Sequence, residues 1–470
     1  MTRKSLFLAC SVAVLVVGTP AHAENLIDVY QAALRSDPVL REAEARRMAA
    51  LEAKPQARGL LFPQVNVTGQ YATRDGESTA LFLSQNDDGT VELRQADQSS
   101  ESDYWTYEAQ VTQSLFRWDQ WQQLKRADAQ VAVAEANFRA AQQNLLVRVS
   151  QAYFDVLAAE DTLAAAEATL EALTRQLEQA DKRFEVGLIA ITDVQEARAA
   201  HDSATAGVIA AKRTLAATQE VLREITNEAY TTLSKPAEQM PLDAPNPADE
   251  QEWVDRALEN NLSVIAARLE TEVAARDVKV ARSGHYPSVD LFASRNEFDT
   301  DATQTNNGIT QPADATQTED TIGVQVTIPI FSGGVTQSRV RESVYLQRAS
   351  REKLEGTMRS AERETRDAYL GVLAEKARVQ ALAQAVKSSQ TALEATEAGF
   401  EVGTRTTVDV LAARRTLFEA QRDYARSRYD YLINIVRLES AAGGLVQDDL
   451  ATINGFLTAP TTLPVVRPKT

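Results

Sequence analysis

The sequence of 470 residues contains almost no cysteine or histidine, and these absences limit the disulfides, metal sites and catalytic sites that the chain can form. Cys10 is the only cysteine, so a disulfide framework is excluded and stability must come from packing and assembly. Beyond the N-terminal stretch only His201 and His285 remain as imidazole groups. No GxSxG, HExxH or phosphate-binding loop occurs. We therefore expect a protein that is not an enzyme and that has no cofactor, metal or catalytic residue.

Basic residues are also in deficit, with 49 Lys and Arg against 66 Asp and Glu and a net charge of -17. A nucleic-acid partner is disfavoured, because phosphates demand a basic surface. Apolar runs are missing too, except at the N-terminus. Arg3 and Lys4 precede the apolar stretch 6–17 and an Ala-His-Ala site, which predicts a secretory signal peptide over residues 1–23. After it no apolar run of 18 residues follows, so any insertion into a membrane must use strands.

Proline is absent from residues 64–235 and 330–459, which are rich in good helix formers. Two uninterrupted helices of about 100 Å at 1.5 Å per residue follow from this, a length that is typical of coiled coils. Shorter helices are expected to pair with them. The expected helices span 25–58, 119–186, 192–228, 251–284, 335–402 and 408–440.

A long internal repeat organises the chain. Residues 184–198 (FEVGLIAITDVQEAR) and 400–414 (FEVGTRTTVDVLAAR) agree at eight of fifteen positions across an offset of 216. The period is far longer than that of a solenoid, so one structural unit is built twice. The expected parts are a signal peptide (1–23), repeat 1 (24–235), a linker (236–250), repeat 2 (251–442) and an irregular tail (443–470).

The repeated segment predicts a tight turn between two helices. Gly187 and Gly403 stand where the end of a helix favours positive φ. Asp193 and Asp409 stand where the next helix favours an N-cap. Each repeat therefore ends its long helix in a hairpin.

Between the helices, each repeat carries two segments of about ten residues in which apolar and polar residues alternate, as in outer-membrane barrel strands. A soluble sheet is the alternative. Polar, acidic segments join the strands of each pair and are expected to be outward loops. Four strands cannot close a barrel, and open edges are not tolerated in lipid, so three copies with twelve strands are expected. The expected strands are 64–73, 104–115, 287–296 and 321–331, and the expected loops are 74–103 and 297–320.

The turn segments AITDVQEAR and VGTRTTVDV, together with the duplicated arrangement of strands and helices, resemble the TolC family of outer-membrane efflux ducts. The resemblance implies a mixed, mainly α fold. A homotrimer would form a twelve-stranded barrel in the outer membrane, continuing into a coiled-coil tunnel in the periplasm. It also implies a passive exit duct for drugs or for proteins of type I secretion. Its partners would be a periplasmic adaptor, an inner-membrane transporter and outer-membrane lipid.

The resemblance also assigns roles at the tunnel entrance. The position of Asp409 would form a ring of three carboxylates, while Ala412 stands where a second acidic ring is expected. Arg405 would bond to Thr192 and Asp193 between helices and hold the entrance shut. Phe400 replaces a Tyr of this latch and has no hydroxyl to donate. The turns at Gly187, Leu188, Gly403 and Thr404 would contact the adaptor.

Two alternatives remain open from the sequence. Asp193 and Asp409 could serve only as helix caps, each contributing about 1 kcal/mol. The whole chain could also be a structural or adhesive coiled-coil protein with a barrel anchor, although strands that interrupt the helices in both repeats favour the duct.

Overall fold

A computed structural model describes residues 24–458 except 86, 88, 238, 239, 307 and 308. The predicted signal peptide, residues 1–23, and the last part of the expected tail lie outside the described residues. The chain forms two compact units, and each combines segments of both sequence repeats. Unit 1 comprises residues up to Glu44, 138–264 and from Met358 onward, and unit 2 comprises 45–137 and 265–357.

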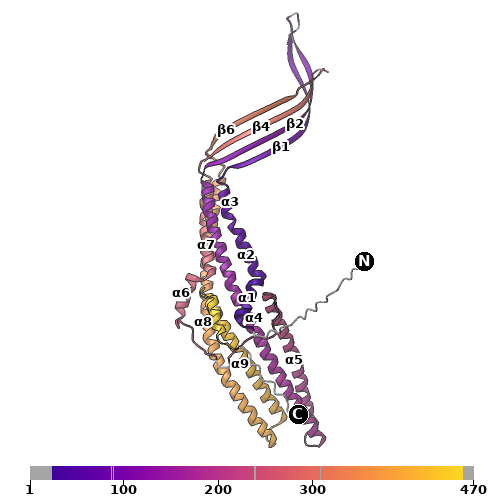
Figure 1. Ribbon diagram of the computed structural model, residues 1–470, viewed down its shortest axis with the longest axis vertical. Helices are drawn as coiled ribbons and strands as arrows, with labels where there is room; N and C mark the ends of the chain where they lie inside the picture. Colours follow the sequence, from indigo (N-terminus) through magenta and orange to yellow (C-terminus); the bar gives the residue numbers. More distant parts are fainter. Residues whose placement is uncertain (1–23, 86, 88, 238–239, 307–308, 459–470) are drawn as a thin grey trace, which may run out of the picture. The chain divides into compact units, whose positions relative to one another are not determined.

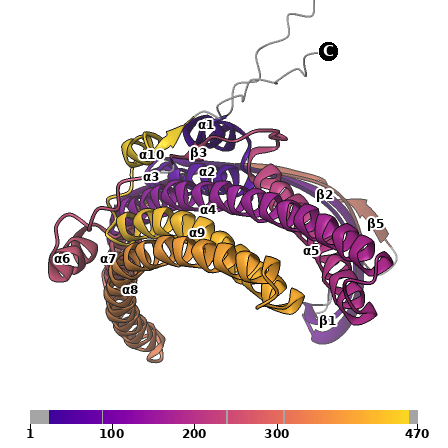
Figure 2. The ribbon, with the colours of Figure 1, turned by 90° about the horizontal axis from the view of Figure 1, so that it is seen from below.

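Two long helical hairpins have most of their length in unit 1, and their bounds agree with the predicted ones to within two residues. The first hairpin is α4 (Trp118–Glu185) with α5 (Ile191–Thr226), and the second is α8 (Val335–Glu401) with α9 (Thr407–Ala441). Figure 2 shows these helices side by side in a curved layer, with α1 (Leu26–Ser36) and α10 (Gln447–Asn454) on its outer side. α10 corrects the expectation of an irregular tail, because Leu450 and Ile453 are buried one turn apart on it.

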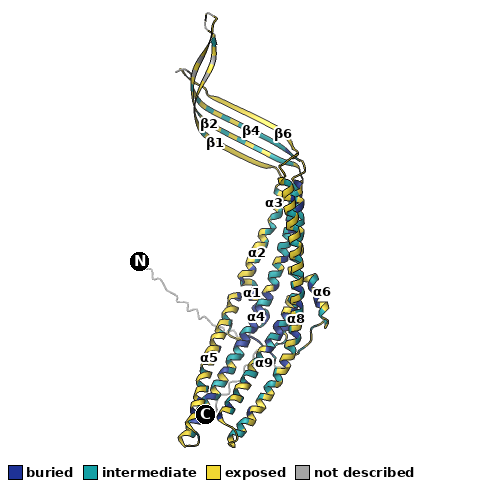
Figure 3. Cartoon of the chain, turned by 180° about the vertical axis from the view of Figure 1, so that it is seen from behind, coloured by how far each residue is buried: buried dark blue, intermediate teal, exposed yellow. Residues whose placement is uncertain are grey.

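The largest core of unit 1 lies where these short helices cover the hairpins. Tyr153, Phe154 and Leu157 of α4 are fully buried there beside Leu432 of α9 and Leu26 of α1. Towards the hairpin turns the buried residues thin out into small separate clusters, and Figure 3 shows the turns almost wholly exposed. The turns are therefore the part of unit 1 whose side chains are available to a partner.

Two of the half-length segments, 25–58 and 251–284, were each expected to be one continuous helix, and both are broken in the structure. Residues 25–58 form α1, α2 (Pro38–Leu51) and α3 (Ala53–Gly59), while 251–284 form α6 (Glu250–Asn260) and α7 (Leu262–Ser283). Asp37 and Asn261 occupy the breaks with extended backbone, and each side chain accepts a backbone N–H of the following helix. A short polar side chain can cap a new helix in this way, so the breaks follow from local chemistry.

Asp37 is also the best-buried carboxylate of unit 1, with 1% of its surface exposed. Arg148 of α4 binds it through two parallel bonds, Nη1 to Oδ1 at 3.1 Å and Nη2 to Oδ2 at 2.7 Å. Replacing Arg148 by Met should destabilise the folded chain by about 3–5 kcal/mol, because a buried carboxylate loses the cation that binds it among the described residues. Thermal melting in detergent measures the loss. Arg148→Met combined with Asp37→Asn should recover part of it, and a melting temperature unchanged by Arg148→Met alone would contradict the assignment.

Unit 2 contains an antiparallel sheet in the order β1-β2-β4, with β5 and β6 both pairing with β4 (Figure 1). Its strands are β1 (Gln64–Gln85), β2 (Val91–Arg117), β4 (Ser288–Asn306), β5 (Ile309–Pro312) and β6 (Ala315–Thr327). The predicted strands are all present, but the expected loops 74–103 and 297–320 are wrong over most of their length. Thr and Ser are frequent in these segments on both faces of the strands, which removes the apolar alternation while the backbone ladder continues.

The alternation that predicted the strands does set the two faces of the sheet. The register places Val65 opposite Val111, Ala293 opposite Ile322 and Leu291 opposite Val324, so these apolar residues share one face. Most of them are exposed within one chain; Val67 exposes 75% of its surface and Ile322 79%. None of the helices among the described residues is both long and apolar enough to cross a bilayer.

The linker 236–250 has almost no secondary structure, yet side chains of the long helices bind its backbone. β3 (Lys235–Pro236) pairs with β7 (Leu457–Thr458). Carbonyl oxygens of the linker, and that of Ser234 just before it, accept hydrogen bonds from helix side chains, namely Ser234 from Tyr153, Pro236 and Ala237 from Arg428, Asp243 from Tyr431, Pro247 from Trp253 and Ala248 from Tyr369. Each buried carbonyl thus gains the partner that a helix or strand would otherwise supply.

Candidate functional site: the turns of the two helical hairpins

The turn between α4 and α5 is built on Gly187. Its φ of 74° lies in the left-handed region, which glycine adopts without steric cost. This geometry lets the N–H groups of Gly187 and Leu188 bond back to the carbonyls of Phe184 and Arg183, both at 2.9 Å. The predicted glycine-based helix end is therefore confirmed at this turn.

The turn between α8 and α9 repeats this geometry at Gly403, whose φ is 76°. The carbonyl of Gly399 accepts three bonds from the turn: the N–H groups of Thr404 and Arg405 and the hydroxyl of Thr404. A Cβ atom at Gly399 would lie 2.8 Å from Cγ of Arg405, so a larger residue here would displace the Arg405 side chain. The first turn has Arg183 at the matching position, so the two turns differ most at this point.

The prediction that Asp193 and Asp409 are N-caps is wrong by three residues. The N-caps are Ala190 and Thr406, and each aspartate lies in the first turn of the helix and reaches back to the N-cap. Asp409 Oδ2 accepts both the N–H of Thr406 at 2.9 Å and its hydroxyl at 3.0 Å. These bonds, foremost the backbone one, hold the pKa of Asp409 below its usual value, with a smaller contribution from Arg405.

The two hairpins share their internal contacts at the repeat offset of 216. Arg198 of α5 faces Asp181 of α4 at 3.9 Å, and Arg414 of α9 binds Glu397 of α8 at 2.6 Å. Val194 and Val410 are buried at matching places behind these ion pairs. Each hairpin is thus closed by its own contacts a few turns from the tip.

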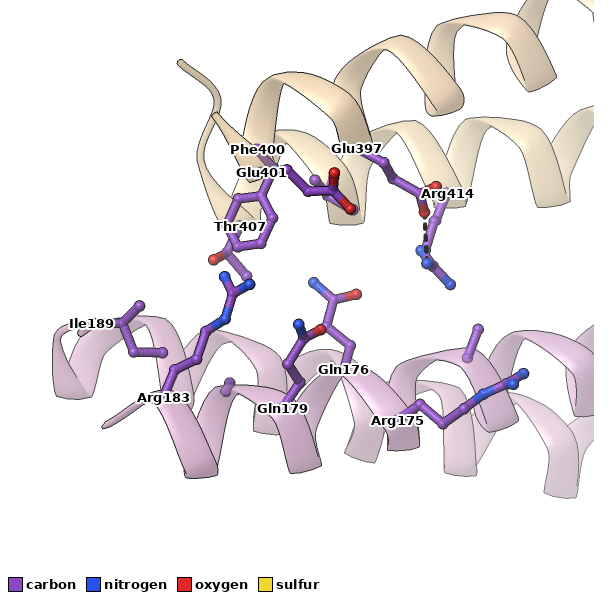
Figure 4. A pocket seen from close by; sticks show the side chains of 13 residues that line it. Arg175, Gln176, Gln179, Arg183, Ile189, Glu397, Phe400, Glu401, Thr407 and Arg414 are labelled. Carbon is purple, nitrogen blue, oxygen red and sulfur yellow. Dashed lines mark hydrogen bonds and ion pairs between the residues drawn. The ribbon is translucent and has the colours of Figure 1, made fainter. Parts of the chain in front are cut away.

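A groove of about 510 Å³ separates the tips of the two hairpins, with Gln176, Gln179 and Arg183 of α4 on one side and Glu397, Phe400 and Glu401 of α8 on the other. Figure 4 shows Arg183 reaching from one hairpin towards the Phe400 ring of the other. The guanidinium carbon lies 5.2 Å from the ring centroid, within the range of a cation–π contact. This contact joins the two hairpins of one chain at the tips.

Comparison with known proteins gives the family. The profile of the outer membrane efflux protein family matches residues 29–228 and 253–444, which make up most of the chain. The chain belongs to this family. An outer membrane protein TolC of Vibrio cholerae is 34% identical over 456 residues, covering 97% of this chain and 99% of the relative. The TolC of Escherichia coli is 36% identical over 444 residues, covering 94% of this chain and 86% of the relative.

Solved structures agree on the fold of this efflux protein. The Campylobacter jejuni CmeC outer membrane channel superposes with a TM-score of 0.71 and 16% identity, covering 97% of this chain and 98% of the channel. The family match and the TolC relatives place the efflux protein in the outer membrane as an exit duct.

The structure brings some of the predicted gate residues of the efflux protein together and leaves others apart. Gly403, Thr404, Arg405 and Asp409 share one turn. Among the described residues of a single chain, no hydrogen bond joins Arg405 to Thr192 or Asp193. Asp193 instead accepts the N–H of Ala190 at 3.2 Å, and Thr192 is exposed. The Arg405 latch remains a prediction for contacts between copies.

Arg183 is the residue at this site that sequence reasoning missed. An arginine in the last turn of a helix usually serves the helix dipole and remains in solvent, so it carries no signal by itself. The internal repeat did hold a signal, because it aligns Arg183 with Gly399 directly before the shared Phe184 and Phe400. A charged residue at a position where the other repeat has glycine indicates that this position has a different role in the first hairpin.

Proposed function

We propose that three copies of this efflux protein form one continuous duct across the outer membrane, in which twelve long strands close a barrel and the helical hairpins form the tunnel. An inner-membrane transporter would deliver drugs or secreted proteins into it through a periplasmic adaptor. The duct itself is passive, and the transporter supplies the energy.

One observation supports the proposed trimer. Within one chain β1 pairs only with β2, and β6 only with β4, so the sheet has two long edges without a partner among the described strands. The same sheet presents an exposed apolar face. Open edges cannot be left in lipid, because each unpaired backbone group costs several kcal/mol there. Pairing β1 of one copy with β6 of the next satisfies both edges and closes a ring.

We expect detergent-solubilised protein to have three times the mass of the mature chain, as measured by light scattering corrected for detergent. Cysteines introduced at Val67 in β1 and Val324 in β6 should crosslink different copies, whereas Val67 paired with a cysteine in α8 at Gly356 should not. A monomer that conducts ions in planar bilayers would refute the trimer.

The hairpin turns are the proposed docking surface for the adaptor. The first turn exposes Val186 and Leu188 by 69% and 72%, and the second exposes Val402 by 75%. Exposed apolar residues grouped in this way are typical of interaction sites. Gly187 and Gly403 contribute by holding these side chains in a tight turn.

The ring of three Asp409 carboxylates is the proposed selectivity filter of the entrance. Replacing Asp409 by Ala should reduce the preference for cations and weaken block by trivalent cations, since clustered charge in a confined mouth concentrates counter-ions. Ala412 supplies no second ring, so block of the wild-type channel should already be weak.

The pKa of Asp409 gives this prediction a pH dependence. A carboxyl whose pKa is lowered in the folded chain stays ionised above that value, so the charge of Asp409 and the strength of its bonds to Thr406 are lost only as the pH falls through it. Cation preference should therefore persist from neutral pH down to about pH 5 and fall only in stronger acid. Reversal potentials in a salt gradient measure it. Strong trivalent block that survives Asp409→Ala would place the filter elsewhere.

A further inference from the structure

The β1–β2 ribbon continues beyond the rest of the sheet. β4 accompanies β2 only as far as the pair Gln98 and Asn306. From Thr79 opposite Asp97 to Gln85 opposite Val91, β1 and β2 pair with each other alone. A two-stranded ribbon is at best marginally stable in water unless one face is covered.

This free part of the ribbon carries an apolar patch, which consists of Leu81, Leu83, Val91 and Leu93. The unbroken register places Leu83 directly opposite Leu93, and all four residues project from the same face. Their exposed fractions lie between 59% and 71%. The patch is therefore contiguous and uncovered in one chain.

The patch is separate from the apolar face that would meet lipid. Leu81 lies ten residues beyond Tyr71, or about 33 Å at about 3.3 Å per residue. On the same face between them the ribbon carries Asp75, Glu77, Glu101 and Asp103 and no basic residue, with Asp75 directly opposite Glu101. An acidic band of this kind cannot enter the hydrocarbon layer, so acyl chains are excluded as the cover.

The rim of the patch suits contact with a copy of itself. Gln85, Gln95 and Thr79 surround it on this face, and the one carboxylate there, Asp97, accepts bonds from Thr79 at 3.1 Å and from Gln95 at 3.3 Å. Identical highly charged surfaces would repel one another around a symmetry axis, whereas an apolar centre whose polar rim carries a single, hydrogen-bonded carboxylate repels far less.

We propose that the patches of neighbouring copies pack against one another above the membrane, so that the three ribbon ends form a collar at the outer mouth of the duct. This inference rests on the proposed trimer, which places three identical patches at one height. Figure 1 shows β1 and β2 continuing beyond the labelled part of the sheet. A ribbon of two strands twists more strongly than a wider sheet, so the face that carries the patch is expected to rotate relative to the apolar face below it. Tethering in the trimer raises the effective concentration of the ends, so a small patch suffices.

Crosslinking tests the collar. The only native cysteine, Cys10, lies in the predicted signal peptide, so Leu83→Cys introduces a single thiol into the mature chain. In isolated outer membranes and in purified trimers, a short bismaleimide should join most Leu83→Cys chains into pairs. Ser84→Cys, one residue away on the opposite face, is the matched control and should yield at least tenfold less. Adding Leu93→Asp to Leu83→Cys should abolish the product.

The outcomes separate the collar from the duct. Trimers by mass whose Leu83 thiols react fully with a soluble maleimide but never crosslink would overturn the collar and leave the duct intact. Crosslinks to a different protein, absent after purification, would also overturn it, because the patch would then serve a foreign partner. Loss of the trimer itself in the wild-type chain would refute the proposed function.

Discussion

Replacing Gly403 by Val is expected to abolish export while leaving the trimer in the outer membrane. Gly403 has a φ of 76°, and a β-branched residue forced into the left-handed region costs about 1–3 kcal/mol. This free-energy cost destabilises a turn that makes few other contacts. We therefore expect the turn to change conformation while the helices stay folded. Drug susceptibility of cells and crosslinking to the adaptor measure the effect.

Two variants make this test specific to backbone geometry. No atom lies within 4 Å of the position that a Cβ on Gly403 would occupy, so crowding cannot explain a loss. Gly403→Asn should therefore keep much of the activity, since asparagine tolerates positive φ. Gly356→Ala in α8, at a site with equal space and ordinary φ, should be neutral. Full export by Gly403→Val would show that the turn geometry is dispensable.

Substitutions of Arg405 and of Arg183 should both open the entrance, but by different amounts. Arg405 is proposed to bind Thr192 and Asp193 of a neighbouring copy, where a charge-assisted bond contributes about 1.5–3 kcal/mol. Arg405→Ser should raise single-channel conductance substantially. Arg183→Ala removes the cation–π contact to Phe400, which contributes about 0.5–1 kcal/mol at an exposed site, so the open population should rise about two- to fivefold.

The neighbouring Arg175 provides the control for both variants. It lines the same groove but pairs with Glu171 on its own helix, so Arg175→Ala should leave conductance unchanged. Phe400→Tyr restores a hydroxyl and should lower conductance. If Arg405→Ser has no effect while Arg183→Ala opens the channel, the contact within one chain holds the entrance and the polar latch between copies is wrong.

The long helices could be predicted closely because nothing in their sequence competes with the helix. Proline is absent, good formers are abundant, and Gly187 and Gly403 end them by a local requirement. The breaks at Asp37 and Asn261 were missed, because a capping side chain in mid-helix is also compatible with a continuous helix on a polar face. The ribbon beyond residue 74 was missed for a different reason. Its backbone hydrogen bonds to the partner strand stabilise it, while its mostly polar sequence is typical of a loop.

At the hairpin turns, the residue types were predictable and their exact positions were not. An aspartate favours the N-cap and also the first helical turn, and only the backbone distinguishes Asp409 at the third helical position from a cap at Thr406. The contact between Arg183 and Phe400 links residues more than two hundred positions apart and depends on how the hairpins pack. Its energy is small, and no local pattern encodes it.

The linker between the repeats has a consequence for how the chain can be cut. Four prolines and little secondary structure would mark residues 236–247 as the natural target of a protease, yet side chains of Arg428, Tyr431 and Trp253 donate hydrogen bonds to carbonyls of this segment. A protease must bind its substrate segment in an extended conformation. The hydrogen bonds from helix side chains hold the linker in place, so it cannot adopt that conformation. The linker is therefore fixed to the helices at several points. We expect the two repeats to remain associated even after a peptide bond within the linker is cleaved.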